Sequence, residues 1–372
     1  MNAFQSMAAS TNRCPVKGCD SRGHVNPSIS QHCTLTACPA YRDRTGQPCE
    51  PDLSRVPLEN RQSLQLFREA QNALASDAEQ DMLAHWRMLP SEYQVEQVAI
   101  GNALLDVWYK SCLPADLACV PVLHYCEFCL ACFTQRLSLT RHSRKCACRH
   151  PPGVEVYREG QVSLFEVDGR HFRAYCQSLC RLAKFFIRHK TLVEGVEAFV
   201  FYVLTEADQT GCRLIGYFSK EKRSLLNYNL SCLLVFPNHM RKGFGFLLID
   251  LSYRISQLEG SVGSPERPLS DAGLAAYRKY WTRALLTRLL EHQGTDISVR
   301  DLSQETGIHA NDIVSTLQSL ELLKYWRGEH FILADKNRLR QKLSACLSTY
   351  MRLADPACLS WRPADYLTGG TA

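Results

Sequence analysis

No segment of this 372-residue chain is long and apolar enough to span a bilayer. The most apolar runs, Ala198–Leu204 and Leu233–Phe236, have only the length of core strands. The segment Met1–Asn12 lacks the apolar core of a signal peptide. We therefore expect a protein that is not secreted and has no membrane partner. Internal repeats and low-complexity tracts are also missing from the sequence.

The chain has no large excess of charge of one sign. It carries 43 Lys and Arg against 37 Asp and Glu, a net charge of +6. This modest charge permits contact with DNA or chromatin but is no argument for it. The composition, 45% hydrophobic and 22% charged, is that of a globular protein, and the length predicts two or three domains with at least one large core.

Cysteine is the residue type in excess, with eighteen copies. Without a signal peptide, metal ligation or buried thiols explain them better than a disulfide framework. Three of them, Cys176, Cys180 and Cys212, sit among apolar residues and are predicted to be reduced core thiols. Eight others precede residue 133 and lie outside any apolar periodicity: Cys14, Cys19, Cys33, Cys38, Cys49, Cys126, Cys129 and Cys132.

Four residues between positions 126 and 146 have the spacing of a tetrahedral zinc site: Cys126, Cys129, His142 and Cys146. The close cysteine pair suits a tight turn, and the last two ligands are expected on one face of a helix over Leu137–Lys145. Four ligands leave no open position, so the metal is structural rather than catalytic. The spacing alone allows a finger that reads DNA, but one finger reads only about three base pairs. A structural platform is the better interpretation.

A second zinc finger is predicted upstream, with Cys14, Cys19, His32 and Cys38 as ligands. His24 and Cys33 compete for the same roles, and the spacing does not choose among these residues. The whole of residues 1–50 has few large apolar side chains, so it needs a metal to fold. Residues 51–92 are predicted to be a linker, helical over Leu58–Leu89.

A strand, a glycine turn and a helix follow one another after residue 229. The strand is expected over Leu230–Phe236 and the helix over Phe246–Glu259. Between them, Arg241-Lys242-Gly243-Phe244-Gly245 would present backbone N–H groups and positive charge to an anion, such as the pyrophosphate of coenzyme A. Taken alone, the motif is better explained as an ordinary turn between a strand and a helix. It is not a Walker loop.

The segment Gly263–Asp271 contains two prolines that stiffen it. Its carboxylate, Glu266, could serve as a general base. The other interpretation is a turn that leads into a helix over Gly273–Trp281, with Ser270 or Asp271 as its cap.

A helix-turn-helix is predicted near the C-terminus, with helices over Ile297–Leu302 and Ile313–Leu323 and a wing over Tyr325–Leu333. The second helix offers few basic residues, so packing against the rest of the domain is a better interpretation than DNA reading.

Together these motifs resemble the MYST family of histone acetyltransferases. The resemblance spans roughly residues 93–363. The segments that carry it are Cys126–Gly153 with its Cys-Cys-His-Cys ligands, Phe201–Asp208, Gly216–Lys222, Asn227–Cys232, Gly243–Gly245, Gly263–Asp271, Tyr277–Trp281, Leu302–Gly307 and Leu323–Trp326. The upstream finger resembles that of the branch associated with the origin recognition complex.

The resemblance implies an α+β fold. Its acetyl-CoA-binding core, residues 154–285, would contain a mixed central sheet. It would lie between a zinc-finger region and a helical part, 286–363, with the helix-turn-helix, and a tail would follow at 364–372. It also implies a nuclear enzyme that acetylates lysines of histone tails and nucleosomes. Such enzymes work with scaffold subunits of a complex.

Particular residues are implied as well. Glu266 matches the general base, Cys232 the active-site cysteine and Lys190 the autoacetylated lysine. The residues that match acetyl-CoA contacts are Leu233, Leu234, Val235, Arg241, Lys242, Gly243, Phe244, Gly245, Phe246, Ser270 and Lys279. Two of these depart from the family pattern: Phe246 replaces a basic residue and Phe244 a tyrosine. Neither change removes the base or the glycines, so we expect an active enzyme.

Two other hypotheses remain. One is a non-enzymatic chromatin- or DNA-binding regulator built from the fingers and the helix-turn-helix, and the other is an inactive scaffold of the same fold. A regulator has no need of Glu266 or of the two glycines.

Overall fold

The structure is a computed structural model. It describes residues 95–363 except 110, 112, 114, 119, 188–189, 191–193, 295–296, 327–328, 334 and 348–350. The predicted upstream finger, the linker and the tail lie outside the described residues. None of the helices in the described part is long and apolar enough to cross a membrane.

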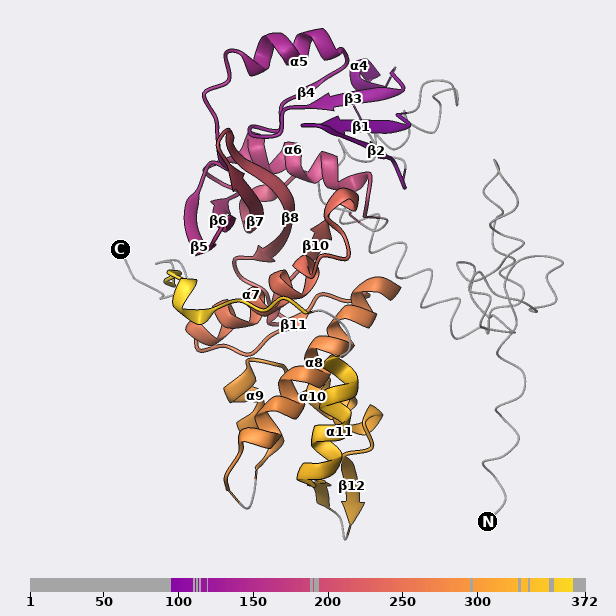
Figure 1. Cartoon of the computed structure of the whole chain (residues 1–372), viewed down its shortest axis with the longest axis vertical. Coiled ribbons are helices and arrows are strands. Elements are labelled where there is room, and N and C mark those ends of the chain that lie inside the picture. The colour runs from indigo at the N-terminus through magenta and orange to yellow at the C-terminus, as the bar shows by residue number, and fades with distance from the viewer. Residues whose placement is uncertain are drawn as a thin grey trace, which may run out of the picture. The chain divides into compact units, whose positions relative to one another are not determined.

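The first module is a small four-stranded sheet with two helices (Figure 1). Its strand order is β2-β1-β3-β4, and β1 runs parallel to β3. The elements are β1 (Gln97–Ile100), β2 (Ala103–Asp106), α4 (Ala115–Ala118), β3 (Val122–Tyr125), β4 (Cys132–Phe133) and α5 (Arg136–Ser143).

The central sheet has five strands in the order β10-β8-β7-β6-β5. These are β5 (Val154–Glu159), β6 (Val162–Asp168), β7 (Phe199–Asp208), β8 (Gly211–Glu221) and β10 (Cys232–Val235). Every neighbouring pair is antiparallel, so the prediction of a mixed central sheet is wrong. Tight hairpins join β5 to β6 and β7 to β8, and a hairpin reverses the chain direction. Among the described strands, β1 with β3 and β9 (Tyr228–Leu230) with β11 (Ser264–Pro265) pair in parallel, and both pairs belong to smaller sheets.

Residues of β7 alternate between the two faces of this sheet, as the two-residue period of a strand requires. Phe201 and Val203 pack with α6 (Arg173–Lys184) and the first module. Tyr202 and Leu204 pack with α7 (Phe244–Leu258) on the other face. Short 3-10 helices, η4 (Val196–Ala198) and η5 (Pro237–His239), precede β7 and the glycine turn.

The predicted strand Leu230–Phe236 is two strands. The chain leaves β9 (Tyr228–Leu230) at Ser231 and enters β10. β9 pairs in parallel with β11 (Ser264–Pro265), whereas β10 pairs with β8. The predicted strand is divided because β9 forms hydrogen bonds with one sheet and β10 with another.

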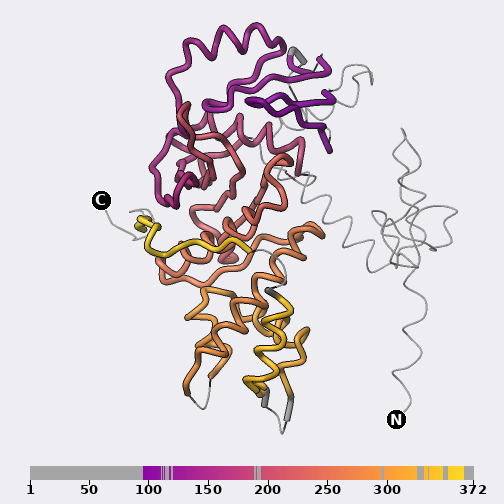
Figure 2. The backbone as a smooth tube through the Cα atoms, viewed as in Figure 1, coloured from indigo at the N-terminus to yellow at the C-terminus, as the bar shows by residue number. Residues whose placement is uncertain are grey.

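The other face of α7 packs against a helical region (Figures 1 and 2). It contains α8 (Asp271–Glu291), α9 (Val299–Thr306), α10 (Ala310–Ser319), β12 (Leu323–Trp326), β13 (Glu329–Ile332) and α11 (Lys336–Leu347). The helix-turn-helix with its wing is thus present at α9, α10 and the β12–β13 hairpin. Its apolar residues Ile313 and Leu317 are buried in the shared core. This agrees with the packing interpretation.

The last described segment, 351–363, is not part of the helical region, contrary to the predicted helical stretch 286–363. Apart from η6 (Pro356–Cys358), it is extended and returns to the central sheet. Ser360 N–H donates to Val156 O at 2.8 Å, and Tyr157 forms an antiparallel bridge with Leu359. In Figure 2 this yellow segment crosses back from the helical region. The buried Trp361 covers one end of the sheet core.

Candidate active site and zinc centre

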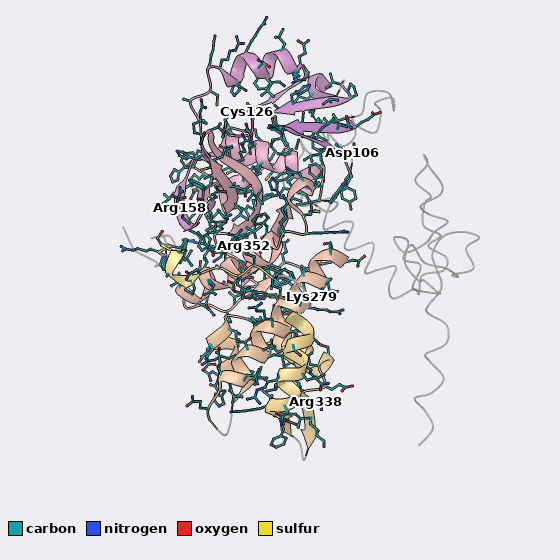
Figure 3. The ribbon with its side chains drawn as sticks, in the orientation of Figure 1. Asp106, Cys126, Arg158, Lys279, Arg338 and Arg352 are labelled. Atoms are coloured by element: carbon teal, nitrogen blue, oxygen red, sulfur yellow. The ribbon has the colours of Figure 1, made fainter. Side chains whose placement is uncertain are left out.

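The predicted ligands of the first zinc site come together in the first module. The ligand atoms of Cys126, Cys129, His142 and Cys146 all lie within 4.8 Å of one another. A zinc ion with bonds of about 2.3 Å to sulfur would separate its ligands by roughly 3.8 Å, so the four side chains fit this metal. Figure 3 shows Cys126 at the base of the module, below α5.

Local backbone structure explains this arrangement. Leu130 adopts a left-handed φ of 59°, and its N–H donates to Cys126 O at 3.0 Å, which closes the turn around the cysteine pair. His142 lies in α5, which ends at Ser143 rather than at the predicted Lys145. A further bond of 2.8 Å from Cys146 N–H to His142 O continues the helical spacing and keeps these two ligands one turn apart.

The two paired thiols differ in acidity even without an ion. A hydrogen bond from Cys129 lowers the pKa of Cys126, and the same contact raises the pKa of Cys129. Sulfur binds a metal as the thiolate, so a cation at this site would displace the protons of both cysteines. No residue of α5 is buried, so this helix depends on the ring contact of Phe133 with His142 at 5.0 Å and on a metal that its ligands would hold.

Two of the three predicted core thiols are confirmed. Cys176 and Cys180 on α6 are buried, and burial raises the pKa of each. Cys212 is only half-buried, at the margin of the same core. All cysteines that the structure describes are free.

Cys232 begins β10, the end strand of the central sheet in the described part. An end strand has backbone groups on one side that pair with no other strand, so Leu233, Leu234 and Val235 can offer peptide groups to a ligand. Cys232 N–H donates to Ser219 Oγ at 3.3 Å, which fixes the cysteine against β8.

Lys190 meets Cys232 inside the domain. The Lys190 Nζ lies 3.8 Å from Cys232 Sγ and 5.9 Å from the ring centre of Tyr217, and only 3% of Lys190 is exposed. Burial by itself lowers the pKa of Lys190, but Cys232, Tyr217 and Cys180 raise it above its ordinary value. Tyr217 and Cys180 are neighbours of this lysine that the sequence did not predict. No local motif could have done so, because they come from β8 and α6.

Glu266 follows β11 directly and is exposed. Its N–H donates to Leu230 O at 2.8 Å, at the end of β9 and two residues before Cys232. The parallel pairing of β11 with β9 therefore brings the candidate base to the start of the strand that carries the candidate cysteine. Asn229 on β9 is buried with no protein partner for its amide atoms in the described part of the chain.

The glycine turn opens α7, as predicted, but the helix begins at Phe244, two residues earlier than expected. Gly243 is the N-cap and has a left-handed φ of 83°, a conformation that favours glycine. Gly245 lies in the first turn, and a Cβ added there would meet no atom within 4 Å. Glycine at this position is not demanded by protein packing, and it leaves the N–H groups of the helix open to an anion.

The side chains around this turn play different roles. Arg241 and Lys242 are exposed, as an anion site requires. Phe244 is buried in the core and Phe246 is half-buried, so Phe244 can contact a cofactor only through its backbone. Met240 and the half-buried His239 precede the turn, and burial followed by the charge of Lys242 lowers the pKa of His239.

Ser270 is confirmed as the cap of α8, and its Oγ accepts from Gly273 N–H at 3.1 Å. Lys279 is exposed on the same helix, roughly 14 Å further along its axis from the rise per residue. In Figure 3 Lys279 lies far from Cys126 of the zinc site. Ser270 and Lys279, which are both predicted to contact the cofactor, therefore do not form one cluster. Only an extended ligand could contact both residues.

Comparison with known proteins agrees with this architecture. Residues 150–358 match the MOZ/SAS family, residues 93–146 the MYST family zinc finger domain, and residues 13–41 the C2HC-type zinc finger. The first of these matches covers more than half of the chain.

Several relatives are similar over the same region. The chain is 48% identical over 269 residues to a protein of Oryza sativa subsp. japonica named putative MYST-like histone acetyltransferase 1. The aligned region covers 72% of this chain and 59% of the relative. Over 269 residues it is also 48% identical to histone acetyltransferase of the MYST family 2 of Arabidopsis thaliana, with shares of 72% and 60%. It is 44% identical over 278 residues to the histone acetyltransferase Tip60 homolog of Caenorhabditis elegans, with shares of 73% and 60%. The chain spans about three fifths of the length of these relatives, and it belongs to the MOZ/SAS family, the MYST-type acetyltransferases that its sequence resembles.

Proposed function

We propose that the protein is a nuclear lysine acetyltransferase that transfers an acetyl group from acetyl-CoA to the ε-amino group of lysines on histone tails. The observation that carries the proposal is the pairing of β11 with β9, which brings Glu266 to the start of the strand that begins with Cys232. The names of the relatives above support histones as the substrate.

Glu266 acts as the general base in this proposal. A free lysine side chain has a pKa of about 10.4, so at pH 7.4 removal of its proton costs roughly 4 kcal/mol. The Glu266 carboxylate accepts this proton, and the neutral amine attacks the thioester carbonyl. The new C–N bond forms and the C–S bond breaks. The nitrogen gives up its second proton to the departing sulfur, so coenzyme A leaves as the thiol, and Glu266 releases the first proton to solvent. Peptide N–H groups of β10 can stabilise the oxyanion between these steps.

Acetyl-CoA is proposed to lie along β10 and the first turn of α7. The residues assigned to it are those of the sequence analysis: Leu233, Leu234 and Val235 beside the acetyl and pantetheine part, the turn from Arg241 to Phe246 at the pyrophosphate, and Ser270 and Lys279 on α8. The exposed charges of Arg241 and Lys242 and the open backbone at Gly245 support the position of the pyrophosphate.

Cys232 has two possible parts in the reaction. Direct transfer between the two bound substrates needs only the base, and Cys232 then lines the site. A covalent route would form an acetyl thioester on Cys232 before the amine attacks. The variant Cys232→Ser decides between these routes, since only the covalent route loses transfer when the thiol is replaced.

Lys190 is proposed as the autoacetylated lysine. Its contact with Cys232 supports this, because the amine already lies at the sulfur beside which the acetyl group would be bound. The proposal also includes structural zinc at the 126–146 site and at the 14–38 finger, and nucleosomes and scaffold subunits of an acetyltransferase complex as partners. Contact with DNA is a further part of it, which the net charge of +6 permits. Membership in the branch associated with the origin recognition complex rests on the finger matched at residues 13–41 and stays a prediction.

The deciding experiment measures transfer from labelled acetyl-CoA to core histones by the wild type and by Glu266→Gln. We expect transfer by the wild type and a loss of about 10²- to 10⁴-fold in the variant. Glu291→Gln, an exposed carboxylate at the end of α8, serves as the control and should keep full activity. If neither the wild type nor the variants transfer acetyl groups while the protein is folded and holds zinc, a binding module or an inactive scaffold becomes the better hypothesis.

A further inference from the structure

Arg267, the residue after the candidate base, is bound to the helix-turn-helix region. Its guanidinium Nη2 lies 2.5 Å from Asp312 Oδ1, across 45 positions of sequence. The Asp312 side chain is only 2% exposed, whereas that of Arg267 is 52% exposed. The buried Asp312 carboxylate of α10 therefore binds the exposed Arg267, which lies next to Glu266 in the segment Gly263–Asp271.

Two backbone bonds hold the same loop from its other end. Gly263 N–H donates to Gly307 O at 2.9 Å, and His309 N–H donates to Gly263 O at 3.0 Å. Residues 307 and 309 form the turn between α9 and α10. The chain around Glu266 is thus bound to this turn at Gly263 and to the first turn of α10 at Arg267, while Glu266 itself bonds to β9.

Packing of α10 against the core does not explain why Asp312 is buried, because burial of a carboxylate costs free energy. The apolar contacts of α10 with the core are made by Ile313 and Leu317. Asp312 has a second carboxylate oxygen that is buried without a hydrogen-bond partner among the described residues. Burial, and then the charge of Asp312, raises the pKa of Tyr277 on α8. Apolar side chains usually replace such buried charges with no loss of stability, so a specific geometric role explains this one better.

We propose that Asp312 and Arg267 are positioning residues that hold the Glu266 carboxylate in place for proton transfer. The helix-turn-helix then serves as the platform of the catalytic loop. The inference rests on the proposed function, because it assigns a task to the loop of the candidate base. Displacement of a reacting group by about 1 Å can cost on the order of 10²-fold in rate, so the ion pair is expected to act on turnover.

The test compares Arg267→Gln and Asp312→Asn with the wild type. We expect kcat for histone acetylation to fall by about 10- to 100-fold, with KM for acetyl-CoA changed less than twofold. Arg267→Lys keeps the charge and should recover part of the loss. The matched control is Arg338→Gln, which removes an arginine paired with Glu321 at 3.0 Å within the same region. Figure 3 shows Arg338 at the far end of this region from Lys279, and its replacement should leave kcat unchanged.

A second measurement does not depend on activity. Hydrogen exchange of the Glu266 amide, which bonds to Leu230 O, should become faster in Arg267→Gln and in Asp312→Asn but not in Arg338→Gln. Wild-type kcat in both variants, or an equal loss of kcat in the control, would overturn the proposal. If the wild type transfers no acetyl group, the proposed function fails, and the exchange rate alone decides: an unchanged rate in both variants overturns the positioning as well, and a faster rate confirms that the pair holds the loop.

Discussion

The amine nitrogen of Lys190 lies 3.8 Å from the sulfur of Cys232, although 42 positions separate them in the sequence. The lysine precedes the strand pair β7–β8, and the cysteine follows it. Lys190 is buried and Cys232 is half-buried, and the lysine amine lies over the ring of Tyr217. This relationship leads to the first of four predictions.

Acetylation of Lys190 is expected to occur within one molecule. Because only 3% of Lys190 is exposed, a second copy of the protein cannot reach it in the folded state. The rate constant, followed by mass spectrometry, should be independent of protein concentration. It should fall in Glu266→Gln by a factor similar to that for histone transfer. The exposed Lys145 provides the comparison for uncatalysed acetylation. A rate that rises in proportion to protein concentration would instead indicate transfer between molecules.

Removal of one zinc ligand should cost the protein one metal ion. In Cys126→Ser, metal analysis by mass spectrometry should find one zinc per chain fewer than in the wild type, because three protein ligands bind the ion far less tightly. The helix α5 should then lose its order, since none of its residues is buried. Cys148→Ser is the control: this exposed cysteine lies next to the site but outside the ligand set, so its zinc content should not change. Equal zinc loss in both variants would contradict the assigned ligands.

Gly245→Ala should separate stability from cofactor binding. The residue lies inside α7 and an added Cβ meets no protein atom, so alanine should stabilise the helix by about 0.5 to 1 kcal/mol. The same methyl group would obstruct the pyrophosphate. We therefore expect a higher Tm together with weaker acetyl-CoA binding, measured by calorimetry.

Gly260→Ala provides the contrast to this variant. Gly260 also has open space around it but adopts a φ of 67°, so alanine there should lower Tm and leave the Kd for acetyl-CoA unchanged. Unchanged binding in Gly245→Ala would show that the pyrophosphate lies elsewhere.

The ion pair between Asp168 and Lys222 should make stability depend on pH. Lys222 Nζ lies 2.8 Å from Asp168 Oδ1 and joins the ends of β6 and β8. Burial raises the pKa of Asp168, but the hydrogen bond from Lys222 and those from backbone N–H groups outweigh it and lower the pKa below its ordinary value. A carboxyl with a depressed folded pKa stabilises the fold above its unfolded pKa, near 4, and this stability is lost as the pH falls through the folded value.

Lys222→Met should accordingly lower the free energy of unfolding by about 1 to 2 kcal/mol at pH 7. The difference from the wild type should shrink below pH 4, where Asp168 becomes protonated in the wild type as well. Urea titrations at the two pH values measure this. In an Asp168→Asn background the lysine substitution should have a smaller effect that does not depend on pH, because the hydrogen bond from Lys222 Nζ to Glu197 O at 3.0 Å is still lost. A full effect there would assign the stabilisation to contacts other than the ion pair.

The sequence alone determined those features that depend on short spacing. Cys126 and Cys129 must share a turn, and His142 and Cys146 must share a helical face, because the chain has few ways to place residues three or four positions apart. The same holds for the glycine turn before α7 and for a helix cap at Ser270 or Asp271, between which only the structure decided. These predictions needed only local geometry, and the boundaries they gave were wrong by no more than a few residues for α5 and α7.

The tertiary structure decided everything that joins distant segments. It divided the predicted strand at Ser231, because β9 and β10 pair with strands of different sheets. It made the central sheet antiparallel and returned residues 351–363 to its edge. The contacts of Lys190 with Cys232 and of Arg267 with Asp312 likewise depend on how whole faces of helices and strands are buried together. Burial of such faces is a collective property of the folded chain, and a residue's neighbours in sequence carry no information about it.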